Sequence, residues 1–222
     1  MERDHISTSY DVELRELRQA LLSMGGLVEL MISNALKSLV ERDSELATRT
    51  IGLDHEVNGL EVQIDEKCLE ILALRQPTAR DLRFITLALK IVTDLERIGD
   101  QCSNIAKRAM ELNEEPVLKP YIDIPRMADR AGTMLREALD SFVRGNDQLA
   151  TKVCQDDAEV DVLFQQIQRE LYTYMIEDHG TISRAMKLIY IAKYLERIAD
   201  HATNIAEMVI FMVKGKDIRH LK

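Results

Sequence analysis

The sequence predicts an all-α protein built as two tandem pseudo-symmetric three-helix bundles, with six long antiparallel helices. Three observations favour this fold. Glycine and proline number only 9 and 4 in 222 residues and aromatic residues make up 5%, so good helix formers dominate. Apolar residues recur at intervals of three and four along most of the chain. The two halves also repeat each other at an offset near 100 residues, which indicates a duplicated domain.

The helices are expected between turns marked by glycine, proline and capping residues. A linker with two prolines, 113–120, separates a first bundle at 1–115 from a second at 116–222. The expected helices are about 11–41, 44–74, 79–115, 123–144, 147–177 and 181–215, with a loose polar start at 1–10 and a short charged tail at 216–222.

Local features define several of these elements. The Gly25-Gly26 pair lies inside the first helix, where each glycine costs roughly 1 kcal/mol relative to alanine, so a bend or a close helix contact is expected there. Asp43 or Ser44 should cap the second helix. Thr78 should cap the third, with Asp81 completing an approximate capping box.

One twelve-residue stretch occurs twice, as LERIGDQCSNIA at 95–106 and LERIADHATNIA at 195–206, and eight of its twelve positions are identical. Each copy holds a glutamate, an aspartate and an asparagine four residues apart, which stacks three oxygen-bearing side chains along one helical stripe. Like charges at this spacing repel by about 0.2–0.5 kcal/mol per pair, so a positive group should lie over each stripe. The residues are Glu96, Asp100 and Asn104, and Glu196, Asp200 and Asn204.

A second polar step is expected to face each stripe. In an antiparallel helix pair, residues equally far from the turn lie side by side, and counting from each turn places a step of the preceding helix level with the stripe, about 30 Å from the turn. Oxygen ligands without histidine or cysteine favour a hard cation such as Mg, Mn, Ca or Fe over structural zinc. The facing residues are Asp54 and Asn58 in the first half and Asp157 and Asp161 in the second.

Other interpretations remain open. The acids could form a solvated face, with Arg97 and Arg197 pairing with the aspartates three residues further on. Glu29 lies at a similar level on the first helix, but its counterpart is Gly132, which makes it a weak candidate. A metal-dependent carboxylate enzyme and a plain helical scaffold are the alternative function classes, although no catalytic acid–base pair or nucleophile constellation is visible.

Net charge limits the ligands that the chain is expected to bind, and cysteine usage indicates its cellular compartment. A net charge of −9 argues against nucleic acid, since phosphate contacts need a basic face, and an acidic chain also disfavours free phosphate. Cys68, Cys102 and Cys154 are expected to be reduced and mostly buried, as in a cytoplasmic protein. The charged start does not fit a signal peptide, and no apolar run is expected to approach a membrane span.

The duplicated LERIGD and LERIAD motifs, RQPTARDLR at 75–83 and the six-helix layout resemble the PhoU family, accessory proteins of bacterial phosphate-specific transport. The resemblance extends over 17–222, including MGGLVE near the start and FMVKG near the end. It implies two pseudo-symmetric bundles, often in a homodimer, and a cytoplasmic non-enzymatic regulator that is peripheral to membrane complexes.

The resemblance also implies a role and a ligand. Such proteins restrain phosphate uptake and repress the phosphate-starvation response, between the ATPase subunit of the phosphate importer and a membrane sensor histidine kinase. The family's E(D)xxxD motifs bind metal in several members, in some as iron or zinc clusters. Three of the four steps keep that pattern here, whereas Asn58 replaces an acid in the fourth. The expected cofactor is therefore a divalent or iron-type metal: Mg, Mn, Fe or Zn.

Overall fold

The computed structural model describes the backbone of residues 2–215 and the side chains from residue 9 onward. The described residues form six α-helices and one short 3-10 helix, and they contain no strand. The elements are α1 (Glu2–Val40), α2 (Ser44–Leu74), α3 (Ala79–Asn113), α4 (Asp123–Arg144), α5 (Asp147–Glu177), η1 (His179–Thr181) and α6 (Ile182–Lys214).

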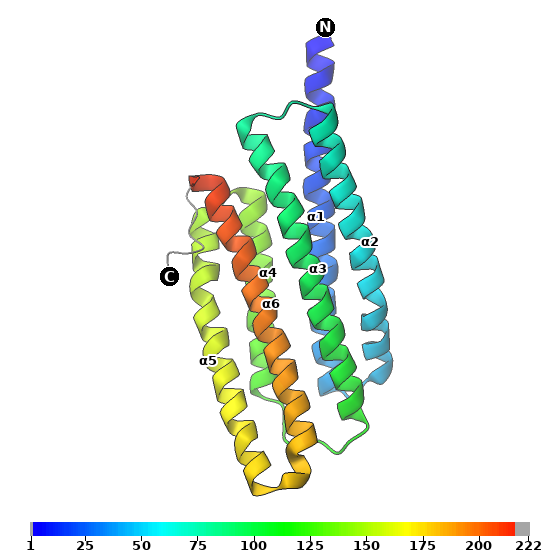
Figure 1. Ribbon diagram of the computed structural model, residues 1–222, viewed down its shortest axis with the longest axis vertical. Coiled ribbons are helices and arrows are strands. Elements are labelled where there is room, and N and C mark those ends of the chain that lie inside the picture. The colour runs from blue at the N-terminus through cyan, green and yellow to red at the C-terminus, as the bar shows by residue number, and fades with distance from the viewer. Residues whose placement is uncertain (1, 216–222) are drawn as a thin grey trace.

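The helices form two bundles that lie side by side, α1–α3 in one and α4–α6 in the other (Figure 1). Within each bundle, successive helices run in opposite directions. Between the bundles, α3 packs against α6 and α1 packs against α4, both antiparallel (Figure 1). The predicted fold class is therefore confirmed.

The helix ends agree with the predicted ranges to within a few residues, except at the start. The chain from Glu2 is already helical, so the expectation of a loose segment at 1–10 was wrong. That segment contains no glycine or proline to interrupt the helix. The next turn of α1 is fastened by Glu13, which forms an ion pair with Arg75 at 2.7 Å. The predicted charged tail at 216–222 lies outside the described residues.

The predicted caps are partly confirmed. The Asp43 carboxylate accepts a hydrogen bond from the backbone N–H of Leu46 at 2.8 Å, which makes it the cap of α2. Thr78 does occupy the N-cap position of α3, but the expected capping box is absent. The Thr78 hydroxyl instead donates to the Asp81 carboxylate at 2.9 Å, so no side chain caps the first N–H groups of α3.

The glycine pair lies at a close helix contact, which is one of the two alternatives expected from the sequence. A Cβ atom on Gly25 would lie 2.3 Å from Cδ1 of Leu139 on α4, whereas one on Gly26 would meet nothing within 4 Å. Gly25 therefore allows α1 and α4 to approach each other, and α1 continues through the pair without interruption.

An apolar stretch of α1, Ser9–Val40, is long and apolar enough to cross a membrane by length and composition, contrary to the sequence expectation. Many of its apolar side chains are core residues: Leu17, Leu21, Met24 and Val28, for example, are buried in the protein. A core helix of this kind satisfies the same test as a membrane span.

The repeated motif lies where α3 crosses α6. Ile98, Gly99 and Cys102 are buried on α3, and so are their counterparts on α6, Ile198, Ala199 and Ala202. A Cβ atom on Gly99 would meet Val57 of α2, so this face of the α3 motif packs inside the first bundle. All three cysteines are free, with Cys154 only half-buried and the other two buried.

Candidate functional site: two acidic clusters

The first acidic cluster comprises Asp54, Asn58, Glu61, Glu96 and Asp100, on α2 and α3. Oδ1 of Asp54 lies 3.7 Å from where a Cβ atom on Gly99 would be, so this carboxylate points at α3. Burial, and then the charges of acidic neighbours including Asp54, raise the pKa of Glu96. The two helices therefore bring Asp54 and Glu61 of α2 close to the acids of α3, at the level that counting from the turn predicts.

Two oxygens of this cluster lack donors. Oδ1 of Asp54 and Oδ1 of Asn58 are buried and accept no hydrogen bond from the described residues. A buried acceptor left without a partner costs about 1–3 kcal/mol. A bound cation would supply the missing interaction at both atoms.

Sequence reasoning missed Glu61 and Asp65 on α2. Burial, and then the charge of Asp65, raise the pKa of Glu61, and burial raises the pKa of Asp65. These residues continue the spacing of three and four that begins at the Asp54 step, which is the signal that could have revealed them. Their counterparts are Phe164 and Gln168, so a search for duplicated acids does not find them.

The second acidic cluster comprises Asp157, Asp161, Glu196 and Asp200, on α5 and α6. Burial, and then the charges of Glu196, Asp157 and Asp161, raise the pKa of Asp200. The acids of α5 and α6 therefore face one another as expected. Lys193 opposes this shift and forms an ion pair with Glu196.

Cations of the chain reach both clusters. Arg97 lies 3.5 Å from Glu96 and 3.5 Å from Asp100, so the solvated-face interpretation is partly realised in the first cluster. Its side chain is 56% exposed. In the second cluster the cation is Lys193, whose Nζ also lies 5.4 Å from the ring centre of Phe164. Arg197 forms no ion pair within the described part of the chain.

The asparagines of the motif do not join the clusters in the same way. Asn204 donates to Asp94 on α3 at 3.4 Å, and the same oxygen lies 2.8 Å from Nδ1 of His201. Eight residues after Glu196, a helix has turned by about 80° beyond two full turns, which directs Asn204 toward the other bundle. Asn104 is half-buried on α3 and makes no side-chain hydrogen bond within the described residues.

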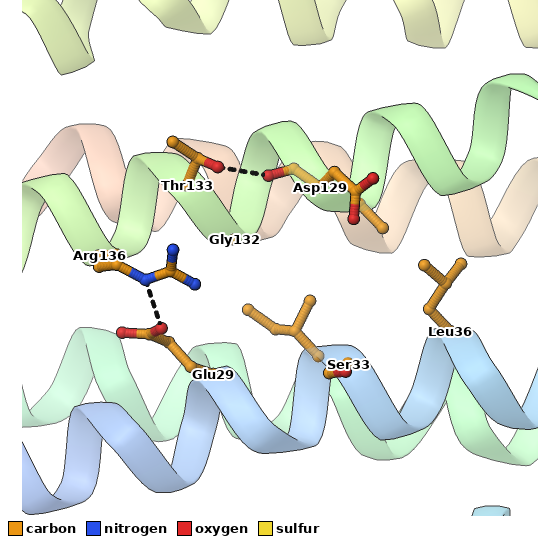
Figure 2. Close-up of a pocket in the computed structure, with 9 residues that line it drawn as sticks. Glu29, Ser33, Leu36, Asp129, Gly132, Thr133 and Arg136 are labelled. Carbon is orange, nitrogen blue, oxygen red and sulfur yellow. Dashed lines mark hydrogen bonds and ion pairs between the residues drawn. The ribbon is translucent and has the colours of Figure 1, made fainter.

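Glu29 is separate from both clusters. It forms an ion pair with Arg136 across the α1–α4 contact, with Oε2 and Nε 2.9 Å apart (Figure 2). The pair borders a cavity of about 320 Å³ that is also lined by Asp129, Gly132 and Thr133 (Figure 2). Glu29 is therefore part of the contact between the bundles.

The metal assignment stays a prediction. No group of three or more His, Cys, Asp or Glu side chains within the described residues is gathered closely enough to hold a metal ion in the present conformation. The donor chemistry nevertheless fits a hard cation, because each cluster offers carboxylate oxygens from two helices and the first adds two buried oxygens without donors.

Comparison with known proteins identifies the family. A family model described as the PhoU domain matches the chain twice, at residues 21–109 and 124–209. The chain belongs to the PhoU family. The resemblance inferred from the repeated motif is therefore confirmed.

Named relatives of the PhoU family match almost the whole chain. The phosphate-specific transport system accessory protein PhoU homolog of Pseudomonas putida is 46% identical over 218 residues, covering 98% of this chain and 85% of that protein. The phosphate-specific transport system accessory protein PhoU of Escherichia coli (strain K12) is 38% identical over 217 residues, covering 98% of this chain and 90% of that protein.

Solved PhoU structures share the fold. The crystal structure of PhoU from Pseudomonas aeruginosa has a TM-score of 0.90 at 45% identity, covering 93% of this chain and 100% of that one. The crystal structure of the phosphate transport system regulatory protein PhoU from Streptococcus pneumoniae has a TM-score of 0.87 at 31% identity, covering 94% and 98%.

Proposed function

We propose that this chain is a regulatory accessory protein of bacterial phosphate transport that represses the phosphate-starvation response. The observation that carries this proposal is the match to named PhoU proteins over 98% of the chain. In this role the chain works in the cytoplasm as a homodimer, between the importer's ATPase subunit and the sensor histidine kinase. It holds the kinase in its repressing state and restrains uptake when phosphate is plentiful.

The acidic clusters supply the cation-dependent part of this proposal. A hard divalent or iron-type ion in the first cluster would take Asp54, Asn58, Glu96 and Asp100 as ligands, and Glu61 lies within reach of the same charges. In the second cluster the ligands would be Asp157, Asp161, Glu196 and Asp200. The ion supplies positive charge between two helices that otherwise repel.

The regulatory consequence follows from charge and rigidity. An ion between α2 and α3, or between α5 and α6, links two helices of one bundle and removes negative charge from that face. A partner that binds this face would therefore encounter a different surface charge in the metal-bound and the metal-free protein, although the fold is the same. This role requires binding and no chemical step, in keeping with relatives named as accessory and regulatory proteins.

The test is an alkaline phosphatase reporter of the starvation response in phosphate-rich medium, in a strain that lacks its own regulator. Three chains are compared at equal abundance: wild type, a variant carrying Glu96→Gln and Asp100→Asn, and a control carrying Glu66→Gln and Glu70→Gln. The control removes two exposed carboxylates with the same spacing from α2, outside both clusters.

Wild type and the control are expected to restore repression, and the cluster variant is expected to restore it only in part. Failure of the wild-type chain would contradict the regulatory proposal. Equal repression by all three chains would leave the regulator in place and remove the acidic cluster from its mechanism, as a plain helical scaffold requires.

A further inference from the structure

One end of the molecule carries a concentration of arginines that the acidic clusters do not involve. We call it the arginine pocket, after Arg18 of α1, Arg80 and Arg83 of α3, and Arg144 of α4. It lies where α3 begins and where α4 and α6 end, in the upper part of Figure 1. These side chains surround a cavity of about 380 Å³.

The charge balance of this pocket is opposite to that of the chain. The protein has a net charge of −9, yet four arginines and a single acid, Asp81, line the cavity. Asp81 is engaged elsewhere, since it accepts the hydroxyl of Thr78 at 2.9 Å. The net negative charge of the whole chain therefore does not describe the field at this end.

The arginines of the pocket are available. Arg18, Arg80 and Arg83 form no ion pair with any carboxylate in the described part of the chain. Arg144 has only a loose pair with Asp140, 3.8 Å away and exposed. Such a pair contributes about 0–1 kcal/mol to stability elsewhere in proteins and gives way readily to a stronger anion.

Two packed aromatic rings form the floor of the pocket. The rings of Phe84 and Phe142 are buried and stack with their centres 5.2 Å apart. The guanidinium of Arg18 lies 4.8 Å from the ring centre of Phe84, a contact that restrains its position. Less conformational entropy is therefore lost when an anion binds there.

The start of α3 provides a second, independent attraction. The first N–H groups of a helix have no partner within the helix, and here no side chain caps them. Arg80 and Arg83 lie in the first turns of this helix, so their charges add to the positive end of its dipole.

The duplication does not require these arginines. At the pseudo-symmetric end of the molecule, Arg80 corresponds to Gly180, Arg83 to Ser183 and Arg144 to Glu41. The fold is therefore compatible with an end that lacks the arginines at these three positions.

We infer that the arginine pocket binds a small, multiply charged oxyanion of the phosphate type, such as inorganic phosphate or pyrophosphate. Planar guanidinium groups match the paired oxygens of these anions, and several of them around one cavity need more negative charge than one carboxylate carries. The site is separate from the proposed cation clusters, the first of which begins about 20 Å further along α3.

The test is equilibrium dialysis of the full chain with radiolabelled phosphate and pyrophosphate, in metal-free buffer of low chloride content. The variants are Arg83→Gln, Arg18→Gln and Arg83→Lys, and the control is Arg49→Gln. Arg49 is an exposed α2 arginine with a loose partner 3.9 Å away, so the control changes net charge equally but lies outside the pocket. Circular dichroism and melting temperature establish that each variant is folded.

The expected result is saturable binding at one site per chain, weakened about 10- to 100-fold by either glutamine variant and less than about 3-fold by the control. Arg83→Lys should weaken binding by an intermediate factor, because lysine keeps the positive charge but lacks the planar, paired N–H donors of arginine. If Arg83→Gln does not fold, Arg80→Gln, at the other exposed arginine of α3 in the pocket, replaces it with the same expectation.

Three results would overturn the inference. The first is no saturable binding of either anion at millimolar concentration. The second is an equal loss of binding in Arg49→Gln and in the pocket variants, which would indicate a diffuse charge effect. The third is binding that requires added divalent metal and is lost in the Glu96→Gln and Asp100→Asn variant, which would locate the anion at a cation cluster.

Discussion

The two acidic clusters occupy equivalent places in the two bundles, but their charge is balanced in different ways. In the second cluster Lys193 lies against Glu196 and over the ring of Phe164. In the first cluster the corresponding positions are Thr93 and Glu61, so a cation is replaced by a neutral residue and a ring by a further acid.

This difference shows that one copy of a duplicated site can offset its carboxylate repulsion with a cation of the chain, while the other copy leaves most of that repulsion uncompensated. A lysine held by an aromatic ring already supplies the positive group that repelling carboxylates require. The first cluster has only Arg97, an exposed side chain at 3.5 Å that can move into solvent at little cost. We therefore expect an external cation to occupy the first cluster before the second, although Asn58 departs there from the family pattern.

The largest expected effect is on cation affinity. The double variant Glu96→Gln, Asp100→Asn removes two of the proposed ligand carboxylates. It should weaken the tightest Mn²⁺ binding by about 100-fold or more. The equivalent change, Glu196→Gln with Asp200→Asn, should weaken that binding by less than about 10-fold. Titration of Mn²⁺ followed by electron paramagnetic resonance measures both. A larger loss from the second pair would reverse the order of the two sites.

Exchanging the neutral and cationic residues tests the cause of the difference. Thr93→Lys should lower the cation affinity of the first cluster by about 10-fold, because its ammonium group competes for the same carboxylates. Lys193→Thr should raise the affinity of the second cluster by a similar factor. Lys90→Thr, one turn before Thr93 on the exposed side of α3, is a control for net charge. No change in either exchange variant would show that lysine occupancy is irrelevant.

The first cluster should also make metal-free stability more sensitive to pH. The pKa values of its members Glu61 and Glu96, and of Asp65 one turn beyond Glu61 on α2, are raised, mainly by burial. Below neutral pH these groups bind protons in the folded state before the unfolded state does. The unfolding free energy they contribute is therefore fully present below about pH 4, the ordinary carboxylate pKa, and is lost as pH rises through their folded pKa values.

Glu61→Gln isolates this contribution. At neutral pH and in chelator it should raise the unfolding free energy by about 0.2–0.5 kcal/mol, because a repelling charge is removed. The gain should shrink as pH falls toward the ordinary carboxylate range, where wild-type Glu61 is itself protonated. Denaturant titration at several pH values measures it, with Glu70→Gln, an exposed neighbour on α2, as the control. A gain independent of pH would mean that repulsion is not its origin.

The smallest effect is expected from making the motifs alike. Gly99→Ala introduces the residue that the second copy has, with a Cβ atom 3.3 Å from Val57 Cγ1 and 3.7 Å from Asp54 Oδ1. Helix propensity favours alanine by about 1 kcal/mol, and the crowding offsets part of it, so the unfolding free energy should change by less than about 1 kcal/mol. Thermal melting measures this. A large loss would show that Asp54 depends on the space beside Gly99.

Features that occur in both halves of the chain could be predicted from the sequence, and features found in only one half could not. The repeated motif, the turn positions and the facing acids all follow from the offset between the halves. Glu61 and Lys193 have no counterpart of the same kind in the other half, so only the folded structure shows that they contribute charge to the acidic clusters. The arginine pocket draws on three helices far apart in the chain, and no local pattern connects Arg18 with Arg144.

Each half of the described chain has three α-helices, an odd number, and this decides which way the second half faces. A unit with three helices ends at the pole opposite its start, so a short connection leads into a copy that is inverted. The α2–α3 hairpin and the α5–α6 hairpin therefore lie at opposite poles (Figure 1). A duplicated pair of two-helix units would offer both of its hairpin turns at one pole, to one neighbour. This molecule is a two-ended rod, able to touch different neighbours at its two ends at once.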